Sequence, residues 1–254
     1  MTEKSLTQLE PVLFTNNRIS AGDLTNAQDV PYQPKIEAEG VDNRSIKWYS
    51  ELIGERLYKL PQFIGGISNR LQGYAKSFEN RLRNLVYKVK KEEPNLGGYF
   101  NPETEETVYN GTHAETNPKF ARHSVTHEMI HLLQKVTGAI KMYTDTLSDH
   151  YGKLYGELGR KLEGFGFKGI RRSLENYGRM FGMYRARAVI EGNASDLTSE
   201  KEGEETEDAY HIYGWTYAMR RAREDLGAGV VAAPQTRKEV LRVDRHLDLV
   251  PAIA

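Results

Sequence analysis

Two histidines and a glutamate on one side of a predicted helix constrain this chain more than any other feature. Apolar side chains recur there in steps of three or four residues, the period of an amphipathic helix; they are Val125, Met129, Leu132, Leu133 and Val136. At about 100° of rotation per residue, His127 and His131 lie on the opposite side, with Glu128 at its edge. The fold must either expose this polar side to water or give its side chains partners.

The segment from His127 to His131 reads His-Glu-x-x-His. This spacing places two imidazoles one helical turn apart with a carboxylate beside the first, which suits a zinc ion and a base for its water. The alternative is a solvated polar face with two ordinary histidines. We predict that His127 and His131 bind Zn²⁺ and that Glu128 is the catalytic base rather than a ligand.

A catalytic zinc site needs a third protein ligand, and one helix face cannot surround the ion. Glu191, on a second predicted helix, is the candidate. Side chains at helical spacing predict a buried face there, with Glu191 at its edge; they are Leu174, Tyr177, Phe181, Tyr184, Ala188 and Ser195. A carboxylate at that edge needs compensation, which a metal would supply. The alternative is an ion pair with Arg187, one turn earlier.

The order of these motifs, His-Glu-x-x-His and then Glu-Gly-x-Ala from Glu191, resembles the gluzincin branch of the zincin metallopeptidases. The segment 210–215 is similar to the Tyr-x-x-Gly helix that follows the ligand glutamate in gluzincins of the peptidase-MA type. Residues 98–110 are similar to the hairpin and edge strand along which an extended substrate docks in zincins. The resemblance covers residues 97–227, a little over half of the chain.

One position departs from the gluzincin pattern. In some gluzincins an aspartate four residues after the ligand glutamate steadies a zinc-bound histidine. Here that position is Ser195, and Asp196 comes one residue later. Asp196 would reach a histidine only with a shifted helix register, so the partner of the second ring nitrogen of each histidine stays open.

The resemblance implies metal-assisted hydrolysis of peptide bonds by a zinc metallopeptidase with an endopeptidase-like cleft. The metal would lower the pKa of its bound water to about 7, and Glu128 would take the proton and pass it to the leaving amine. Tyr210, Tyr213 and Tyr217 recur at helical spacing, so one of them is a candidate donor to the oxyanion. The alternative is that they are core aromatics.

The chain divides into three predicted parts. Residues 1–43 are polar and broken by prolines, which predicts an extended or disordered arm. Residues 44–93 form a helical region, with one apolar stripe that stops at Pro61 and a second that runs from Ile64 to Val89. Residues 94–254 form the zincin-like domain. The fold class is therefore α+β and mainly helical, with a short β hairpin and edge strand before the active-site helix.

Glycines are dense between Thr144 and Gly169, which predicts an irregular segment. Two interpretations stay open there, close helix packing and a mobile flap beside the cleft. Gly138 is expected to end the active-site helix.

Composition fits a globular enzyme. The chain has 35 basic and 35 acidic residues, so its net charge indicates no polyanionic partner. It has no cysteine, which removes disulfides and thiolate ligands. Its first residues are polar and no apolar run reaches membrane-spanning length, so we expect neither a signal peptide nor a membrane span. We therefore expect a cytoplasmic protein that acts on a protein or peptide substrate, with secretion by a non-classical route left open.

Two other classes of function stay open. One is an inactive zincin-like protein with a structural metal, which self-associates through the N-terminal helices. The other is a nucleic-acid-associated protein that uses the basic residues around 81–91 and 171–187. Glu128 argues against a purely structural metal site, because such a site has no need of a base.

Overall fold

The structure, a computed structural model, describes residues 32–93, 96–203 and 213–249. It is mainly helical with one four-stranded sheet, which confirms the α+β class. Its contacts divide the chain into two compact units, one of Met1–Phe63 with Ala75–Leu132 and the other of Ile64–Tyr74 with Leu133–Ala254. None of the described helices combines the length and apolar character that crossing a membrane requires.

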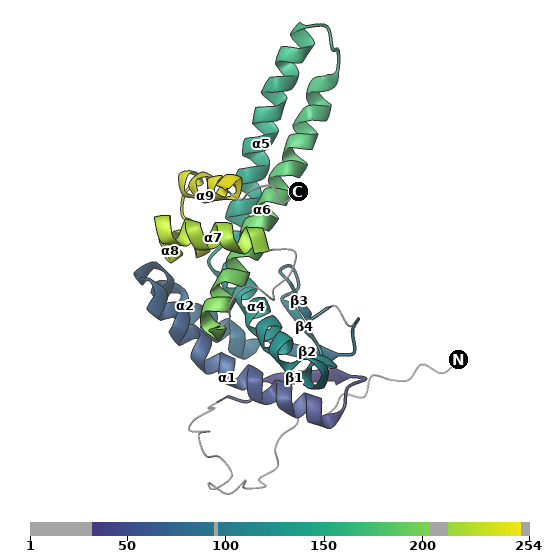
Figure 1. The fold of residues 1–254 in the computed structure, drawn as a ribbon, viewed down its shortest axis with the longest axis vertical. Helices are drawn as coiled ribbons and strands as arrows, with labels where there is room; N and C mark the ends of the chain where they lie inside the picture. Colours follow the sequence, from purple (N-terminus) through teal and green to yellow (C-terminus); the bar gives the residue numbers. More distant parts are fainter. Residues whose placement is uncertain (1–31, 94–95, 204–212, 250–254) are drawn as a thin grey trace, which may run out of the picture. The chain divides into compact units, whose positions relative to one another are not determined.

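The sheet belongs to the first unit and has the strand order β1-β2-β4-β3 (Figure 1). Strands β1 (Lys35–Glu39), β2 (Val86–Lys90) and β4 (Glu106–Asn110) run parallel to one another. Strand β3 (Gly98–Asn101) pairs with β4 in antiparallel register, Tyr99 opposite Val108. The predicted hairpin is therefore present, and β3 is an edge strand.

Strand β2 corrects the prediction that the helix continues to Val89. The helix ends at Asn84, and the chain then pairs with β1 on one side and β4 on the other. Tyr87 and Val89 are fully buried, and they alternate with more exposed residues as a strand requires. Two rows of strand hydrogen bonds and this burial outweigh the helical spacing. Strand β1 likewise lies in the predicted arm, whose residues 1–31 are outside the described residues.

Helices α1 (Asn43–Ile67) and α2 (Asn69–Asn84) follow β1 in the chain. The prediction that Pro61 stops the first helix is wrong, since α1 continues for six residues beyond it. Proline removes one backbone hydrogen bond from a helix interior. The fully buried side chains of Leu60 and Ile64 on either side of Pro61 offset that loss.

The short helix α3 (His113–Thr116) leads into α4 (Pro118–Val136), which carries the His-Glu-x-x-His motif. Asn117 caps α4, because its side-chain oxygen accepts a hydrogen bond of 3.1 Å from the Phe120 amide. Gly138, at φ 76°, ends the turn after α4, as predicted. The apolar side of α4 is buried, and Val125, Met129, Leu132 and Leu133 are each at most 1% exposed.

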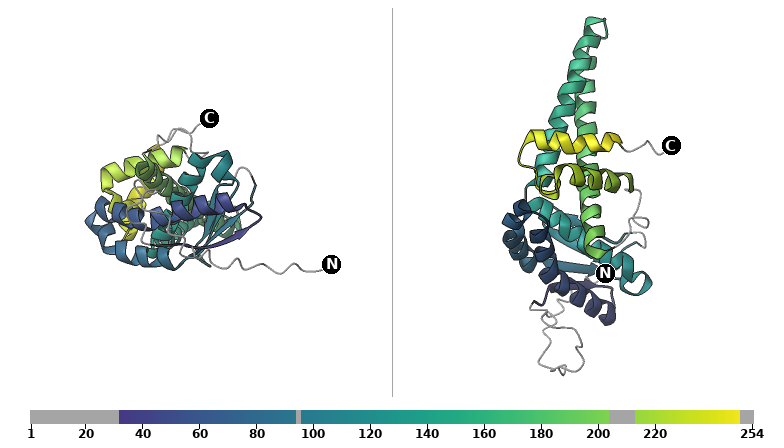
Figure 2. Two further views of the ribbon diagram at one scale, coloured as in Figure 1. Left: turned by 90° about the horizontal axis from the view of Figure 1, so that it is seen from below. Right: turned by 60° about the vertical axis from the view of Figure 1, so that its left-hand side comes forward.

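The second unit is built on the long antiparallel helices α5 (Ala139–Gly164) and α6 (Ile170–Glu202) (Figure 2). The prediction of an irregular segment at 144–169 is wrong, because α5 is helical through most of it. A Cβ atom added at Gly178 would lie 2.3 Å from the Tyr151 carbonyl oxygen, and one at Gly182 equally close to that of Leu147. The glycines therefore serve close helix packing, the first of the two interpretations.

Three short helices complete the second unit. They are α7 (Tyr213–Leu226), α8 (Ala228–Ala232) and α9 (Arg237–Asp244), followed by the 3₁₀ turn η2 (Arg245–Leu249). They share one buried apolar core with α5 and α6, made of Ala139, Tyr143, Leu147, Ala186, Val189, Ala218, Met219, Ala222, Val231, Val240 and Val243. This core fixes the part of α6 that carries Glu191.

Candidate metal centre

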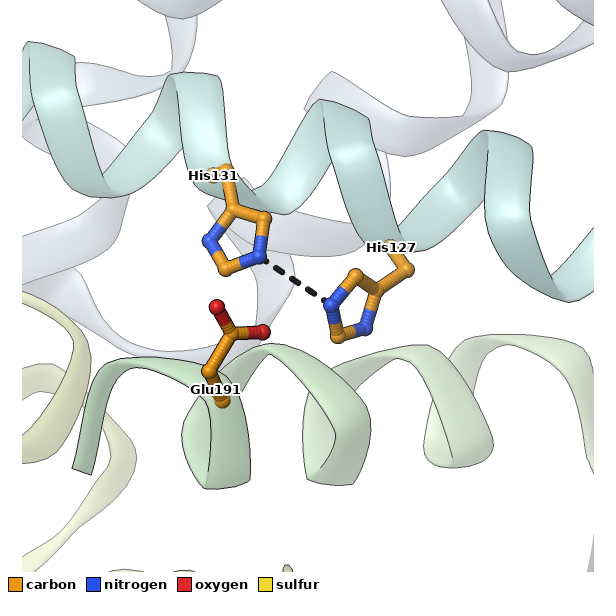
Figure 3. A group of neighbouring side chains, drawn as sticks. All are labelled: His127, His131 and Glu191. Carbon is orange, nitrogen blue, oxygen red and sulfur yellow. Dashed lines mark hydrogen bonds between the residues drawn. The ribbon is translucent and has the colours of Figure 1, made fainter. Parts of the chain in front are cut away.

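The two histidines of α4 point their outer ring nitrogens toward each other (Figure 3). The Nε2 atoms of His127 and His131 are 3.1 Å apart. The polar side of α4 is mostly removed from water, since His131 and Glu128 are only 7% and 8% exposed and Gln134 is 1% exposed. The alternative of a solvated polar face is therefore wrong, and these polar groups need partners.

Glu191 of α6 completes the group. One ligand atom from each of His127, His131 and Glu191 lies within 4.8 Å of the others. Figure 3 shows the Glu191 carboxylate directed at the two imidazoles. In the part of the chain that the structure describes, this is the only cluster of three His, Cys, Asp or Glu side chains that could hold a metal ion. The three predicted ligands are thus brought together.

The donor set fits a zinc ion. Two nitrogens bound at 2.0–2.1 Å in tetrahedral geometry would be about 3.3 Å apart, close to the 3.1 Å between the two Nε2 atoms. Two imidazoles and one carboxylate also form a common ligand set of catalytic zinc, which leaves a fourth position for water or substrate. The same nitrogen–nitrogen distance suits a hydrogen bond if one ring carries its proton at Nε2.

The end of α4 holds the backbone of α6 beside Glu191. Gln134, one turn after His131, donates a hydrogen bond of 2.8 Å from its side-chain nitrogen to the Ile190 carbonyl oxygen. On another side of α6, a Cβ atom at Gly192 would lie 2.6 Å from the carbonyl oxygen of Trp215 in α7. The glycine after Glu191 is therefore required by close contact between two helix backbones.

Arg56 supports α4 at the residue before His127. Its side chain is 3% exposed, and its Nε donates a hydrogen bond of 3.0 Å to the Thr126 hydroxyl. Arg56 lies within the apolar stripe of α1, so its spacing in the sequence did not distinguish it from the residues of the core. The only indication of its role in the sequence was that a charged residue stands in an otherwise apolar stripe.

Tyr109 of β4 lies behind the motif and was not predicted as a site residue. Its ring stacks between those of Tyr49 and Tyr87, at centroid distances of 5.8 and 6.3 Å, and its hydroxyl donates to the Val125 carbonyl oxygen at 3.4 Å. Burial raises the pKa of Tyr109 well above its usual value, and the charges of Tyr87 and Glu128 add to that effect. Tyr109 therefore stays neutral and fixes the turn of α4 before Glu128.

Asp196, the candidate partner of a histidine, is bound by two arginines of α7. Arg220 Nε lies 3.0 Å and Arg223 Nε 2.9 Å from its two carboxylate oxygens. Desolvation raises the pKa of Asp196, while the two arginines act in the opposite direction. The role of Asp196 that the structure supports is to join α6 to α7.

Of the three tyrosines proposed as oxyanion donors, only Tyr217 has a side chain among the described residues. Tyr210 lies outside the described residues, and the side chain of Tyr213 is also outside them. Tyr217 is 46% exposed, so the alternative of a core aromatic is wrong for this residue. His123 stacks on His127 at a centroid distance of 6.0 Å, one turn earlier on α4.

Comparison of the chain with models of protein families, with curated proteins and with solved structures found no match. The functional argument therefore depends on the geometry of His127, Glu128, His131 and Glu191.

Proposed function

We propose that this protein is a zinc-dependent peptidase of the gluzincin type. The observation that carries the proposal is the cluster of His127, His131 and Glu191, whose ligand atoms lie within 4.8 Å of one another. The resemblance of the motifs to gluzincins adds to it. A structural metal site would explain the cluster but gives no role to Glu128.

His127, His131 and Glu191 would hold the metal. When bound there, zinc would polarise a substrate carbonyl and make water acidic enough to serve as the nucleophile near neutral pH. The Gln134 and Arg56 contacts hold the two helix backbones on which these donors depend.

Glu128 would act as the general base. It follows His127 directly, is 8% exposed and is not among the three clustered donors. A carboxylate shielded from bulk water and adjacent to the metal ligands can take a proton from the attacking water and return it to the leaving amine. A glutamine in its place would keep the shape of the side chain and lose the proton acceptor.

An extended polypeptide is the substrate class that the first unit favours. Strand β3 is an edge strand and pairs, among the described strands, only with β4. An edge strand offers backbone groups to an added chain in extended conformation. A peptide bound in this way presents its backbone carbonyls at regular intervals, which suits an endopeptidase.

Elemental analysis and a peptide-library digest test the proposal together. Wild-type protein should contain about one zinc ion per chain, lose it when Glu191 is replaced by alanine, and cleave peptides. The E128Q variant should keep the zinc and lose cleavage by roughly a factor of a thousand or more. E175Q, which changes a glutamate of α6 paired with Arg179, is the matched control. Full cleavage by E128Q, or no zinc after reconstitution of the wild type, would contradict the proposal.

A further inference from the structure

Two phenylalanines are exposed at the turn that joins α5 to α6. Phe165 is 81% exposed and Phe167 is 58% exposed. The turn itself is well ordered by backbone hydrogen bonds, with the amides of Phe165 and Phe167 donating to the Leu162 carbonyl oxygen at 3.0 and 3.2 Å. Gly166, at φ 98°, allows the tight reversal between the two rings. The ordered turn therefore keeps both rings exposed to solvent.

Basic side chains surround the two rings. Between residues 160 and 172 there are five basic residues and one acidic residue, Glu163, which gives a formal charge of +4; the basic residues are Arg160, Lys161, Lys168, Arg171 and Arg172. All five are exposed. None of them has an ion-pair partner among residues that the structure describes. Their charge is therefore available to an anionic surface.

The turn lies at the free end of a stiff helical arm. In Figures 1 and 2 it is at the opposite end of the α5–α6 hairpin from α7, α8 and α9. The hairpin is closely packed near this end, since a Cβ atom at Gly159 would lie 2.6 Å from the Arg171 Cα. No described element of the second unit covers Phe165 or Phe167. Because the turn is ordered, incomplete folding does not explain why these two aromatic side chains are exposed, and an interaction site does.

We propose that this turn docks on an anionic lipid surface. Phe165 and Phe167 would enter the boundary between headgroups and acyl chains, where burial of their rings is favourable. The five basic side chains would stay at the level of the headgroups and attract anionic lipid, each strengthening binding roughly fivefold. The arm would bind at the membrane surface without crossing it.

The shape of the turn favours lipid over the other partners of basic and aromatic residues. A convex tip with two rings offers much less than the roughly 800 Å² per partner of a stable protein interface. Single-stranded nucleic acid stacks its bases on aromatic side chains inside a basic groove, whereas Phe165 is exposed to solvent on an outer turn. A lipid surface needs neither a groove nor a complementary partner shape.

Co-sedimentation with vesicles tests the proposal with the full chain. Wild type should bind vesicles of phosphatidylserine and phosphatidylcholine, bind vesicles of phosphatidylcholine alone much more weakly, and be released by high salt. F165S/F167S should weaken binding by roughly tenfold or more per ring. K161Q/K168Q should weaken it roughly 25-fold on the anionic vesicles. M180S is the control, because Met180 is 70% exposed but lies about 15 Å along α6 from Ile170.

A tryptophan at the tip gives an independent measurement. F165W should show a blue shift of its emission on anionic vesicles and quenching by brominated acyl chains, beyond the signal of the native Trp48 and Trp215. Thermal unfolding should be the same for all these variants, because the substituted side chains are exposed. Equal binding of wild type and F165S/F167S, or binding to an oligonucleotide but not to vesicles, would overturn the proposal. The E128Q variant should bind vesicles as the wild type does, so this outcome is separate from peptidase activity.

Discussion

The two halves of α6 reverse the usual relation between polarity and burial. In the first half, Tyr177, Met180 and Tyr184 are 56%, 70% and 56% exposed. In the second half, polar side chains are buried; they are Asn193, Ser195, Asp196, Thr198 and Ser199. One helix therefore exposes large apolar side chains to water at one end and buries polar side chains in the protein at the other.

The difference lies in what each half packs against. The first half contacts α5 through its glycines, as at Gly178 and Gly182, which leaves its outer side to solvent. The second half is enclosed by other helices, so each buried polar group needs a partner there. Asp196 has the two arginines of α7, and Glu191 faces the two histidines of α4. A carboxylate on α6 is thus compensated by fixed cations in one case and by imidazoles in the other.

Loss of the Asp196 carboxylate should give the largest effect on stability. Asp196 is fully buried, and its removal takes away the carboxylate that binds both Arg220 and Arg223, which leaves Arg223 with Glu200 alone. Breaking a buried pair costs about 3–5 kcal/mol; because Arg220 is 38% exposed and water can reach it, we expect D196A to lose about 3 kcal/mol. Urea unfolding measures this change. E175A, which breaks an exposed pair with Arg179, should lose much less stability than D196A, and equal losses would show that the two halves do not differ.

Zinc should stabilise the protein through Glu191 and not through Asp196. At a free zinc concentration of 100 times the Kd, binding adds about 2.7 kcal/mol to the free energy of unfolding. The wild type and D196N should both show this increment, each relative to its own metal-free form, and E191A should not. Thermal unfolding with zinc and with a chelator measures it. An increment retained in E191A would separate Glu191 from the metal.

Close packing between α5 and the first half of α6 predicts a smaller loss of stability when a side chain is added at a glycine there. A Cβ atom at Gly182 would lie 2.3 Å from the Leu147 carbonyl oxygen and 2.7 Å from the Ser148 Cα. The backbones of α5 and α6 would have to separate, so G182A should cost about 2 kcal/mol. G164A is the matched control, because no atom lies within 4 Å of the added Cβ there and alanine favours a helix by about 1 kcal/mol over glycine. A neutral G182A would mean that the hairpin adjusts without strain.

The sequence predicted the components of the metal cluster better than their surroundings. His-Glu-x-x-His fixes two imidazoles by helix geometry alone, and Glu191 followed from the cost of a carboxylate at a buried face. The assumed face was only half right, since Ala188 and Ser195 are buried whereas Tyr177 and Tyr184 are exposed. Helical spacing shows which residues share a side but not whether another helix covers it.

Elements that depend on distant partners could not be predicted from local patterns. Strand β2 has residues that fit a helical stripe, and only pairing with β1 and β4 makes it a strand. The arginines that bind Asp196 follow it by more than twenty residues, with no spacing rule to connect them. The predicted hairpin of β3 and β4, by contrast, pairs two strands that are close together in the chain, so it needs no distant partner.

Of these predictions, we expect the smallest effect on stability from protonation of Glu175 in the first half of α6 and Asp196 in the second. Arg179, through its hydrogen bond, lowers the pKa of Glu175 in the first half, whereas desolvation raises the pKa of Asp196 in the second. The Glu175 contribution to stability is therefore present above about pH 4.5, the unfolded value, and is lost as the pH falls below it. The contribution of Asp196 has the opposite sign. Its protonation favours the folded state below the unfolded pKa of about 3.8, and that gain is lost as the pH rises through the raised folded pKa.

Carboxyl carbon shifts followed by NMR through an acid titration can measure both groups. We expect Glu175 to titrate below 4.5 and Asp196 above 3.8. In E175Q the stability difference from the wild type should shrink as the pH falls, because the wild type then loses the same interaction. In D196N that difference should be largest at acid pH and shrink as the pH rises, because the wild type then loses the gain from protonation of Asp196 and the amide does not titrate. An Asp196 that titrates below 3.8 would mean that the arginines outweigh its burial, and the two halves of α6 would then treat their carboxylates alike.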